Sequence, residues 1–409
     1  MTPDTGNTPL ATTSATWRDG PATVWTLGFV SLLMDVSSEL IHSLLPVFLT
    51  TVLGASMVDV GLIEGIAEAT AAVAKVFSGA LSDRIGKRKL LVGIGYGLAA
   101  ITKPVFPLAG TAWAVLAARF VDRIGKGIRD APRDALIADI TPPAVRGAGY
   151  GIRQALDTVG GFVGPLSAVA LMALYADNFR AVFWWALLPA GLAVLLIVVG
   201  VREPDGTVAT GKRGWPVHKQ ELKRMPASFW VVMAIGVVFA LARFSQAFLV
   251  LKAQAEGLAL ALLPLVFVWM NLVYAVTATP AGILSDRFGR VNVLLGGLAA
   301  LIVADLALAF IPGISGVTIG VGLGGLYLGF SQGLLSALVA DTAPPDLRGT
   351  AFGLYNLVTG GALLLASVLA GWLWYDFGPT ATFSAGAVFS GLAILIVAFG
   401  LRTEPKPAA

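Results

Sequence analysis

The chain has 409 residues, of which 56% are hydrophobic and only 13% are charged, and its formal net charge is +4. Soluble domains carry about a quarter of charged residues, so this composition excludes an ordinary soluble protein, and the small net charge gives no reason to expect a nucleic-acid partner. Cysteine is absent, which excludes disulfides, thiolate nucleophiles and cysteine metal sites.

Apolar stretches of about 20 residues, the length that crosses the hydrocarbon core of a bilayer, recur along the whole chain. We therefore expect a multi-pass membrane protein surrounded by lipid. Residues 1–22 are rich in Thr, Pro and Gly and lack the basic start and apolar core of a signal peptide. They predict a disordered cytoplasmic tail.

Apolar runs between polar breaks predict twelve membrane-spanning helices. Their ranges are 23–49, 57–80, 90–109, 112–138, 147–174, 180–200, 228–253, 260–282, 292–311, 315–340, 350–374 and 380–401. The polar segment 201–227 predicts a cytoplasmic linker between two six-helix bundles, 23–200 and 228–401, and residues 402–409 predict a short cytoplasmic tail.

Basic residues gather on one side of the predicted membrane. If both termini are cytoplasmic, most of the 28 Lys and Arg residues fall in cytoplasmic segments, while the outer loops hold Arg180 and Lys252. Cytoplasmic loops of membrane proteins carry such an excess. We therefore predict a protein of the bacterial cytoplasmic (inner) membrane with both termini in the cytoplasm.

The two halves repeat each other. GALSDRIGKRKLL at 79–91 returns as GILSDRFGRVNVL at 282–294, and ADITPPAVRGAGYG at 138–151 returns as ADTAPPDLRGTAFG at 340–353. The offsets are 203 and 202 residues, and two matches at nearly one offset indicate a parallel repeat of two six-helix halves.

These motifs resemble those of the major facilitator superfamily over essentially all twelve spans. Gly79, Leu81, Asp83, Arg84, Gly86, Lys87 and Arg88 are similar to the loop signature of that family, and Gly282, Asp286, Arg287, Gly289 and Arg290 are similar to its second copy. Arg119 and Gly125 resemble the fourth-span signature, although Asp122 and Arg123 stand where that signature usually has Gln and Gly. The resemblance implies an all-α membrane protein of twelve transmembrane helices in two six-helix bundles related by pseudo-two-fold symmetry.

The loop signature contains Asp83 and Arg84, and its repeat contains Asp286 and Arg287. An aspartate at a helix end can accept hydrogen bonds from the N-terminus of a neighbouring helix, and an arginine can pair with a carboxylate across the gap. Contacts of this kind can form in one conformation and break in another. We therefore predict that these four residues form a conformational latch, the alternative being that the bases only enforce topology.

The fourth span is the most heavily charged. At about 100° per residue, its charged residues from Arg119 to Asp134 fall within an arc of roughly 140°, and because a charge at the membrane centre is costly, this face should point into the bundle. Its deeper members are predicted to line a polar cavity: Arg119, Asp122, Arg123 and Lys126. Those near the cytoplasmic end are predicted to form ion pairs between helices: Asp130, Arg133 and Asp134.

Three other spans of the first half present polar faces that should converge on the same cavity. They are Asp35, Glu39 and His42 on the first span, Glu64 and Glu68 on the second, and Arg153 and Asp157 on the fifth. Intramembrane carboxylates generally have functional roles, so at least one of them is expected to titrate and to couple protons. His42 is open to three interpretations: a proton relay, a metal ligand or a hydrogen-bonded packing residue.

The second half carries less charge at matching positions. Through the offset of 202, Asp122 corresponds to Gly324 and Asp157 to Thr359, while Asp305 is a lone charge in the ninth span. The side chains predicted to line the cavity from this half are Arg243, Gln246, Asn271, Tyr274, Tyr355 and Asn356. We therefore expect the coupling chemistry in the first half.

The segment GGFVGP in the fifth span combines close packing with a bend. Gly160 and Gly164 allow another helix to approach closely, and Pro165 removes a backbone hydrogen bond. By resemblance, the same segment is the signature of antiporters that export their substrates.

The predicted function is secondary active transport by alternating access, as proton-coupled antiport that exports a small organic molecule. A monomer is expected, with the proton gradient as the energy source and no cofactor. The alternatives are a divalent-metal transporter using Asp35, Glu39 and His42, an organic-anion transporter using Arg119, Arg123, Lys126 and Arg153, and a non-transporting membrane sensor. No metal site is predicted in the main interpretation. An enzyme is not expected, because no nucleophile motif or metal-ligand spacing stands out.

Overall fold

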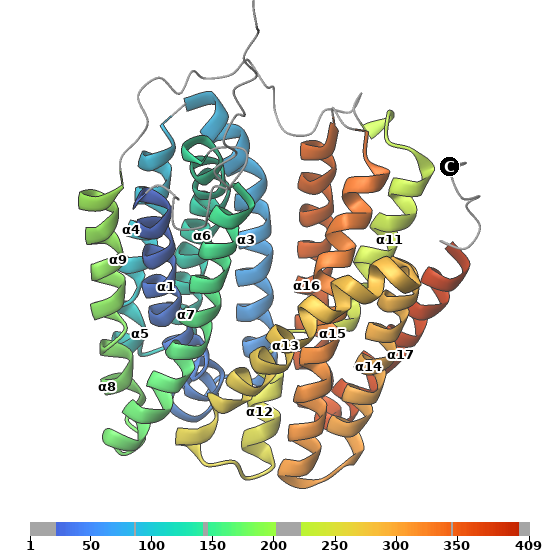
Figure 1. The fold of residues 1–409 in the computed structure, drawn as a ribbon. Helices are drawn as coiled ribbons and strands as arrows, with labels where there is room; N and C mark the ends of the chain where they lie inside the picture. The colour runs from blue at the N-terminus through green and yellow to red at the C-terminus, as the bar shows by residue number, and fades with distance from the viewer. Residues whose placement is uncertain (1–21, 86, 142–145, 202–221, 345–346, 401–409) are drawn as a thin grey trace, which may run out of the picture.

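The computed structural model describes residues 22–85, 87–141, 146–201, 222–344 and 347–400, and all regular secondary structure in these ranges is helical (Figure 1). The first half contains α1 (Ala22–His42), α2 (Leu45–Val47), a π-helix (Phe48–Val52), α3 (Met57–Ile85), α4 (Arg88–Thr102), α5 (Val105–Leu108), α6 (Ala112–Ile140), α7 (Arg146–Leu174), α8 (Phe179–Trp184) and α9 (Leu187–Gly200). The second half contains α11 (Ala227–Ala242), α12 (Ala247–Ala255), the 3-10 helix η4 (Leu260–Leu262), α13 (Leu265–Phe288), α14 (Arg290–Phe310), α15 (Gly313–Thr342), α16 (Arg348–Phe377) and α17 (Pro379–Gly400).

These elements form the predicted twelve transmembrane segments in two six-helix bundles. In the described part of the chain, ten segments are long and apolar enough to cross a membrane by length and composition alone. The remaining two are α3 and α6, each of which carries several charged residues. The two least apolar helices therefore need neighbours that accommodate their charges.

Four of the predicted spans are each divided into two α-helices, where one continuous helix was expected. Three breaks lie close to a proline, at Pro46, Pro104 and Pro189, as expected for a residue that cannot donate a backbone hydrogen bond. The fourth break separates α11 from α12 at residues 243–246 and contains no proline. By contrast, Pro132 and Pro165 lie inside the unbroken helices α6 and α7.

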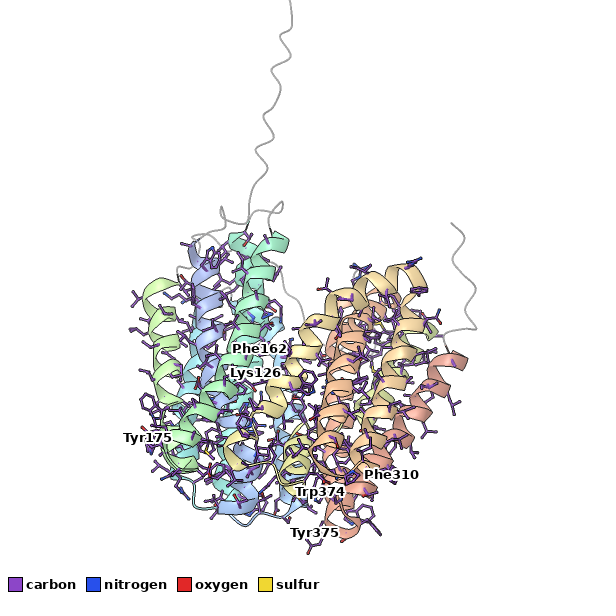
Figure 2. The ribbon with its side chains drawn as sticks, turned by 60° about the horizontal axis from the view of Figure 1, so that its bottom comes forward. Lys126, Phe162, Tyr175, Phe310, Trp374 and Tyr375 are labelled. Atoms are coloured by element: carbon purple, nitrogen blue, oxygen red, sulfur yellow. The ribbon has the colours of Figure 1, made fainter. Side chains whose placement is uncertain are left out.

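The two bundles lie side by side and their ribbons diverge toward one end (Figure 1). We call this end, where α9 ends and α11 begins, the linker end, and the opposite end the hairpin end. At the hairpin end α2 contacts α12, and η4 contacts α7. Tyr175, Phe310 and Tyr375 lie on the outer rim of the bundle there (Figure 2), where aromatic side chains typically meet the membrane interface.

Helices α3 and α16 form the closest contact between the halves, and glycines permit it. A Cβ atom at Gly61 would lie 2.2 Å from the Ser367 carbonyl oxygen, and one at Gly371 would lie 2.4 Å from the Met57 carbonyl oxygen. Small residues let membrane helices approach in this way. The contact depends on the absence of side chains at these positions.

We predict that Gly371→Ala destabilises the protein. The added methyl group would overlap the backbone of α3, and overpacking of this kind costs about 1 to 3 kcal/mol. The matched control is Gly361→Ala on the same helix, because a Cβ there meets no atom within 4 Å. Thermal unfolding of both purified variants in detergent should show a lower midpoint for Gly371→Ala alone, and equal midpoints would contradict this account of the α3–α16 contact.

Candidate functional site

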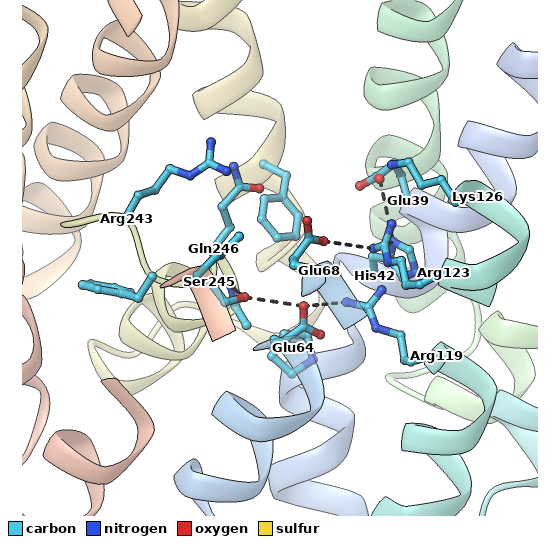
Figure 3. Close-up of a pocket in the computed structure, with 15 residues that line it drawn as sticks. Glu39, His42, Glu64, Glu68, Arg119, Arg123, Lys126, Arg243, Ser245 and Gln246 are labelled. Carbon is cyan, nitrogen blue, oxygen red and sulfur yellow. Dashed lines mark hydrogen bonds and ion pairs between the residues drawn. The ribbon is translucent and has the colours of Figure 1, made fainter. Parts of the chain in front are cut away.

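A central cavity of about 240 Å³ lies between the two halves (Figure 3). Its walls come from α1, α2, α3 and α6 in the first half, and from the α11–α12 break, α12, α13 and α16 in the second. The residues that line it are Glu39, His42, Pro46, Glu64, Glu68, Arg119, Arg123, Lys126, Arg243, Phe244, Ser245, Gln246, Ala247, Phe267 and Leu363. Nine of these were predicted from the sequence to face a cavity.

A second cavity of about 530 Å³ continues from the first toward the linker end. The two share Glu68, Arg243 and Leu363. Polar side chains in the second cavity include Lys75, Asp130, Tyr327, Ser331, Tyr355, Asn356 and Thr359. Together the cavities form a polar path from the middle of the protein toward the linker end.

Glu64 joins the two halves within the central cavity. Its carboxylate accepts a hydrogen bond of 2.5 Å from Arg119 of α6, and the Ser245 hydroxyl of the second half donates to the same oxygen at 3.5 Å. Figure 3 shows this carboxylate between the two donors. Arg119 is only 2% exposed, so Glu64 supplies the partner that a buried guanidinium requires.

Arg123 connects three helices. It lies 3.6 Å from the Glu68 carboxylate of α3 and 3.5 Å from His42 Nδ1 of α1. Because a guanidinium has donors and no acceptor, Nδ1 can only accept here, which requires neutral His42. The Glu39 carboxylate lies 3.8 Å from the same nitrogen, beyond hydrogen-bond distance.

Two cations in the cavity have no partner in the described part of the chain. The side chains of Lys126 of α6 and Arg243 of the α11–α12 break make no ion pair or hydrogen bond to another described residue. Figure 2 places Lys126 between the two bundles. With all groups charged, the three carboxylates of the cavity face four cations, so its field favours an anionic group.

Asp122 does not line this cavity, contrary to the prediction. It turns into the first bundle, where Lys103 lies 3.1 Å from its carboxylate and also donates to Ser38 at 3.0 Å. Lys103 is fully buried, and it follows the end of α4. The prediction missed Lys103, although a single lysine inside an apolar span is the signal that could have revealed it.

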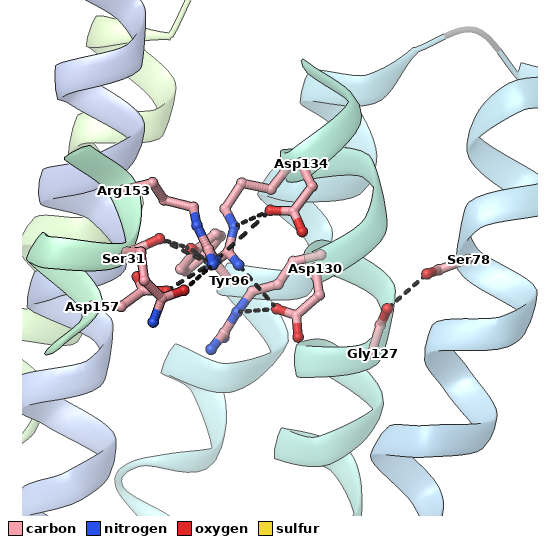
Figure 4. A network of polar contacts seen from close by, with 11 residues as sticks. Ser31, Ser78, Tyr96, Gly127, Asp130, Asp134, Arg153 and Asp157 are labelled. Carbon is pink, nitrogen blue, oxygen red and sulfur yellow. Dashed lines mark hydrogen bonds and ion pairs between the residues drawn. The ribbon is translucent and has the colours of Figure 1, made fainter. Parts of the chain in front are cut away.

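A second polar network lies inside the first bundle, toward the linker end (Figure 4). Arg133 of α6 donates to the Ser31 hydroxyl at 2.9 Å and to the Tyr96 hydroxyl at 3.2 Å. It also lies 3.7 Å from Asp130 and 3.4 Å from Asp134. These contacts agree with the predicted ion-pair segment at this end of α6.

Arg153 and Asp157 belong to this network and not to the central cavity. They pair with each other at 2.9 Å, and Arg153 also lies 3.7 Å from Asp134. The prediction that both face the interior of the protein agrees with the structure. They lie inside the first bundle, however, and not in the central cavity. Their mutual pair removes the reason to expect Arg153 to hold an anion.

The GGFVGP segment of α7 packs against α1 at two carboxylates that were predicted to face the cavity. A Cβ atom at Gly160 would lie 2.8 Å from the Cβ of Asp35, and one at Gly164 would lie 2.8 Å from the Cβ of Glu39. Asp35 lines neither cavity, contrary to the prediction, and its side chain makes no ion pair or hydrogen bond to another described residue. The fifth span therefore packs closely against α1 at both of these carboxylates.

The predicted residues of the second half divide between different surroundings. Gln246 lines the central cavity, and Tyr355 and Asn356 line the second cavity, where Gly236 leaves room for the Tyr355 ring. Asn271 and Tyr274 of α13 line neither cavity. The face of α13 that meets the central cavity carries Phe267 instead.

The latch stays a prediction, because the side chains of Asp83, Arg84 and Asp286 lie outside the described residues, and Arg287 is exposed beside Phe288. A related contact occurs once within each half. Arg88 lies 3.1 Å from Asp139, and Arg290 pairs with Asp341. Each pair joins the start of the third helix of its half to the end of the fourth.

A metal site finds no support in the described part of the chain. Among those residues, no group of three His, Asp or Glu side chains lies together as a metal site requires. Asp35, Glu39 and His42 share a face of α1 without converging on one point, and the neighbouring cations would repel a metal ion.

Comparison with known proteins identifies the family. The model of the Major Facilitator Superfamily matches residues 27–271 and 247–409. The chain belongs to the major facilitator superfamily. Members of this superfamily with this fold are membrane transporters and not enzymes, so the chain is a transporter.

Relatives in the superfamily match nearly the whole chain. An uncharacterised MFS-type transporter of Methanocaldococcus jannaschii is 32% identical over 392 residues, covering 93% of this chain and 96% of the relative. The gentisate transporter of Corynebacterium glutamicum is 26% identical over 348 residues, covering 80% of this chain and 76% of the relative. The crystal structure of the nucleoside transporter NupG shares the fold, with a TM-score of 0.73, 15% identity, and coverage of 94% of this chain and 100% of that one.

The buried Lys103–Asp122 pair gives a test of the site's architecture. Lys103→Met leaves the Asp122 carboxylate buried without its cation, and we expect the free energy of unfolding to fall by about 3 to 5 kcal/mol. The double variant Lys103→Met/Asp122→Leu removes both charges and should recover most of that loss. Denaturant titrations in detergent micelles, followed by circular dichroism, measure both values; equal losses in the single and double variants would show that the pair is not the cause.

Proposed function

We propose that this transporter carries a small organic anion by alternating access and couples its movement to protons. The observation that carries the proposal is the pair of unpartnered cations, Lys126 and Arg243, which face one central cavity from opposite halves. A cargo held by both would link the two bundles. Its arrival and departure would therefore bias their relative position, as alternating access requires.

The geometry of the cavity supports an anionic cargo. Arg119 and Arg123 are already paired with Glu64 and Glu68, which leaves Lys126 and Arg243 as the cavity cations without a carboxylate partner among the described residues. Guanidinium and ammonium groups bind carboxylates by charge-assisted hydrogen bonds. The gentisate transporter among the relatives supports a carboxylate as a reasonable first cargo to test.

The carboxylates of α1 supply the proposed proton coupling. Asp35 is free of ion pairs to described residues and Glu39 has only the distant His42, so either can take up a proton without first breaking a strong pair. Protonation of Glu39, which lines the central cavity, would make that cavity more positive and would strengthen the binding of an anion. Proton and anion then bind together, which favours symport.

Antiport export of a small organic molecule is the second candidate. It is favoured by the contact of GGFVGP with α1 at Asp35 and Glu39, since that contact lets a movement of α7 reach the carboxylates directly. The distribution of Lys and Arg predicts that the linker end faces the bacterial cytoplasm. The polar path leads toward that end, so cargo would be loaded from the cytoplasm. In this mechanism a cargo would displace the proton.

The cargo site can be tested by binding. A ligand that binds the folded state raises its apparent stability, so gentisate should raise the thermal midpoint of the purified transporter more than an uncharged nucleoside does. We expect Lys126→Gln and Arg243→Gln each to weaken gentisate affinity by about tenfold or more, since a lost charge-assisted contact costs about 1.5 to 3 kcal/mol.

The matched control for lost positive charge is Lys223→Gln, at an exposed position outside the cavity. It should bind gentisate as the parent protein does. If a panel of carboxylates fails to stabilise the protein, or if all three variants weaken binding equally, the anion assignment is wrong.

Proton coupling can be tested in everted membrane vesicles. A protonophore should abolish accumulation or extrusion of the bound carboxylate, and the direction in which an imposed proton gradient drives it separates symport from antiport. Asp35→Asn should make the remaining transport insensitive to the gradient. Asp177→Asn, in an exposed turn with a φ of 60° that asparagine tolerates, is the control and should behave like the parent protein. Full gradient dependence in Asp35→Asn would refute its coupling role.

A further inference from the structure

The second half contains a buried carboxylate that the proposed mechanism does not use. Asp305 lies in the C-terminal half of α14 and is only 3% exposed. Its Oδ2 atom has no hydrogen-bond partner, and no described cation forms an ion pair with it. An ionised carboxylate in this setting would be strongly unfavourable.

The neighbouring helix α17 leaves space for this carboxyl group. A Cβ atom at Gly386 of α17 would lie 2.6 Å from Asp305 Oδ2 and 3.0 Å from the Phe244 ring. Any side chain at position 386 would therefore displace the carboxyl group. The space for Asp305 exists because α17 has a glycine at this position.

Comparison of the two repeats shows that the second half lacks an ion pair at this position. Lys103 corresponds to Asp305 and Asp122 to Gly324 through the offset of 202. The structure supports this register, because a Cβ atom at Gly95 would lie 2.5 Å from the Gly125 carbonyl oxygen, and one at its counterpart Gly297 would lie 3.7 Å from that of Tyr327. In the first half the two positions form a buried ion pair, whereas in the second the partner is a glycine whose Cβ would meet no atom within 4 Å.

A small cavity of about 50 Å³ occupies the place of the missing partner. Gly324 and Asp305 both line it, and its volume has room for at least one water molecule. The other titratable or charged groups that line it are Tyr327 of α15 and Arg243, while α13 contributes Met270. From α17, Gly386 packs against Asp305 and carries no charge.

We propose that Asp305 is a proton-binding site of the second half, neutral in this conformation, and that Arg243 is the cation that stabilises its carboxylate when the proton leaves. On release, the carboxyl O–H bond breaks, the proton passes to water in the small cavity, and the bonding electrons stay on the carboxylate. A proton is favoured over a metal cation because Asp305 is the only carboxylate lining this cavity in the described chain.

Arg243 is placed to respond to both cavities. It lies in the four-residue break between α11 and α12, lines the central cavity as well as the small one, and pairs with no described carboxylate. An anion held by Arg243 in the central cavity would keep its guanidinium away from Asp305, so the proton would stay bound. This part of the inference rests on the proposed anionic cargo, whereas the proton site itself does not.

Infrared difference spectroscopy on the full-length protein in lipid bilayers tests the site without any cargo. The C=O stretch of a protonated carboxyl group should be present at about pH 7 and absent from Asp305→Asn, which should unfold at the same temperature as the parent because asparagine imitates the neutral acid. The band should not change when choline replaces sodium in the buffer. Identical spectra for parent and variant, or a band that sodium removes, would overturn the proton site.

Two further variants test the surroundings of Asp305. Gly324→Lys would restore a cation at the position of the missing partner and should abolish the band, whereas Gly324→Met, of similar size and without charge, should keep it. Arg243→Gln should raise the pH at which the band disappears by about one unit, a tenfold increase in proton affinity. A band that survives in folded Gly324→Lys would contradict the site, and an unchanged titration in Arg243→Gln would refute the role of Arg243. Failure of these tests would leave the proposed transport intact.

Discussion

The charges of α6 impose the constraint on which the first half depends, because a charge inside the membrane must be paired or hydrated. Partners can reach α6 only if neighbouring helices approach it closely. Glycines permit that approach: a Cβ atom at Gly95 of α4 would lie 2.5 Å from the Gly125 carbonyl oxygen, and one at Gly127 would lie 2.3 Å from the Cβ of Ala74 in α3. The charges of α6 can therefore be paired only if α3 and α4 pack closely against this helix.

This constraint also distinguishes charges that have a partner inside the protein from charges that a cargo could bind. Side chains of α6 that turn toward α4 find partners inside the bundle, as Asp122 finds Lys103 and as Arg129 lies 4.3 Å from the Tyr96 ring centroid. Lys126 turns toward the interface between the halves, where water in the cavity can hydrate it. A cation can stay unpaired in a membrane protein only in such a place, so the free charges mark the space that a cargo would enter.

The fold and the position of the cavity could largely be predicted from the sequence, because both follow from periodicity. Apolar runs predicted the twelve segments, and the repeat predicted the two halves. The charged arc of α6 correctly indicated an interior face, but an arc of this width meets two neighbours, and periodicity cannot tell which side chain meets which. Asp122 was therefore assigned to the wrong space. The break at 243–246, which places Arg243, contains no proline, so no local signal in the sequence indicates it.

The repeat explains why the two halves can share a fold and differ in chemistry. The third and fourth helices pack against each other in both halves, while the side chains at this contact change from Lys103 and Asp122 to Asp305 and Gly324. A fully buried ion pair is costly to open, because each charge would lose its partner without gaining water. The first half therefore holds its pair permanently. A single carboxyl group beside a small cavity can change its charge by exchanging one proton, so at this helix contact the second half can gain or lose a charge where the first half holds a fixed pair.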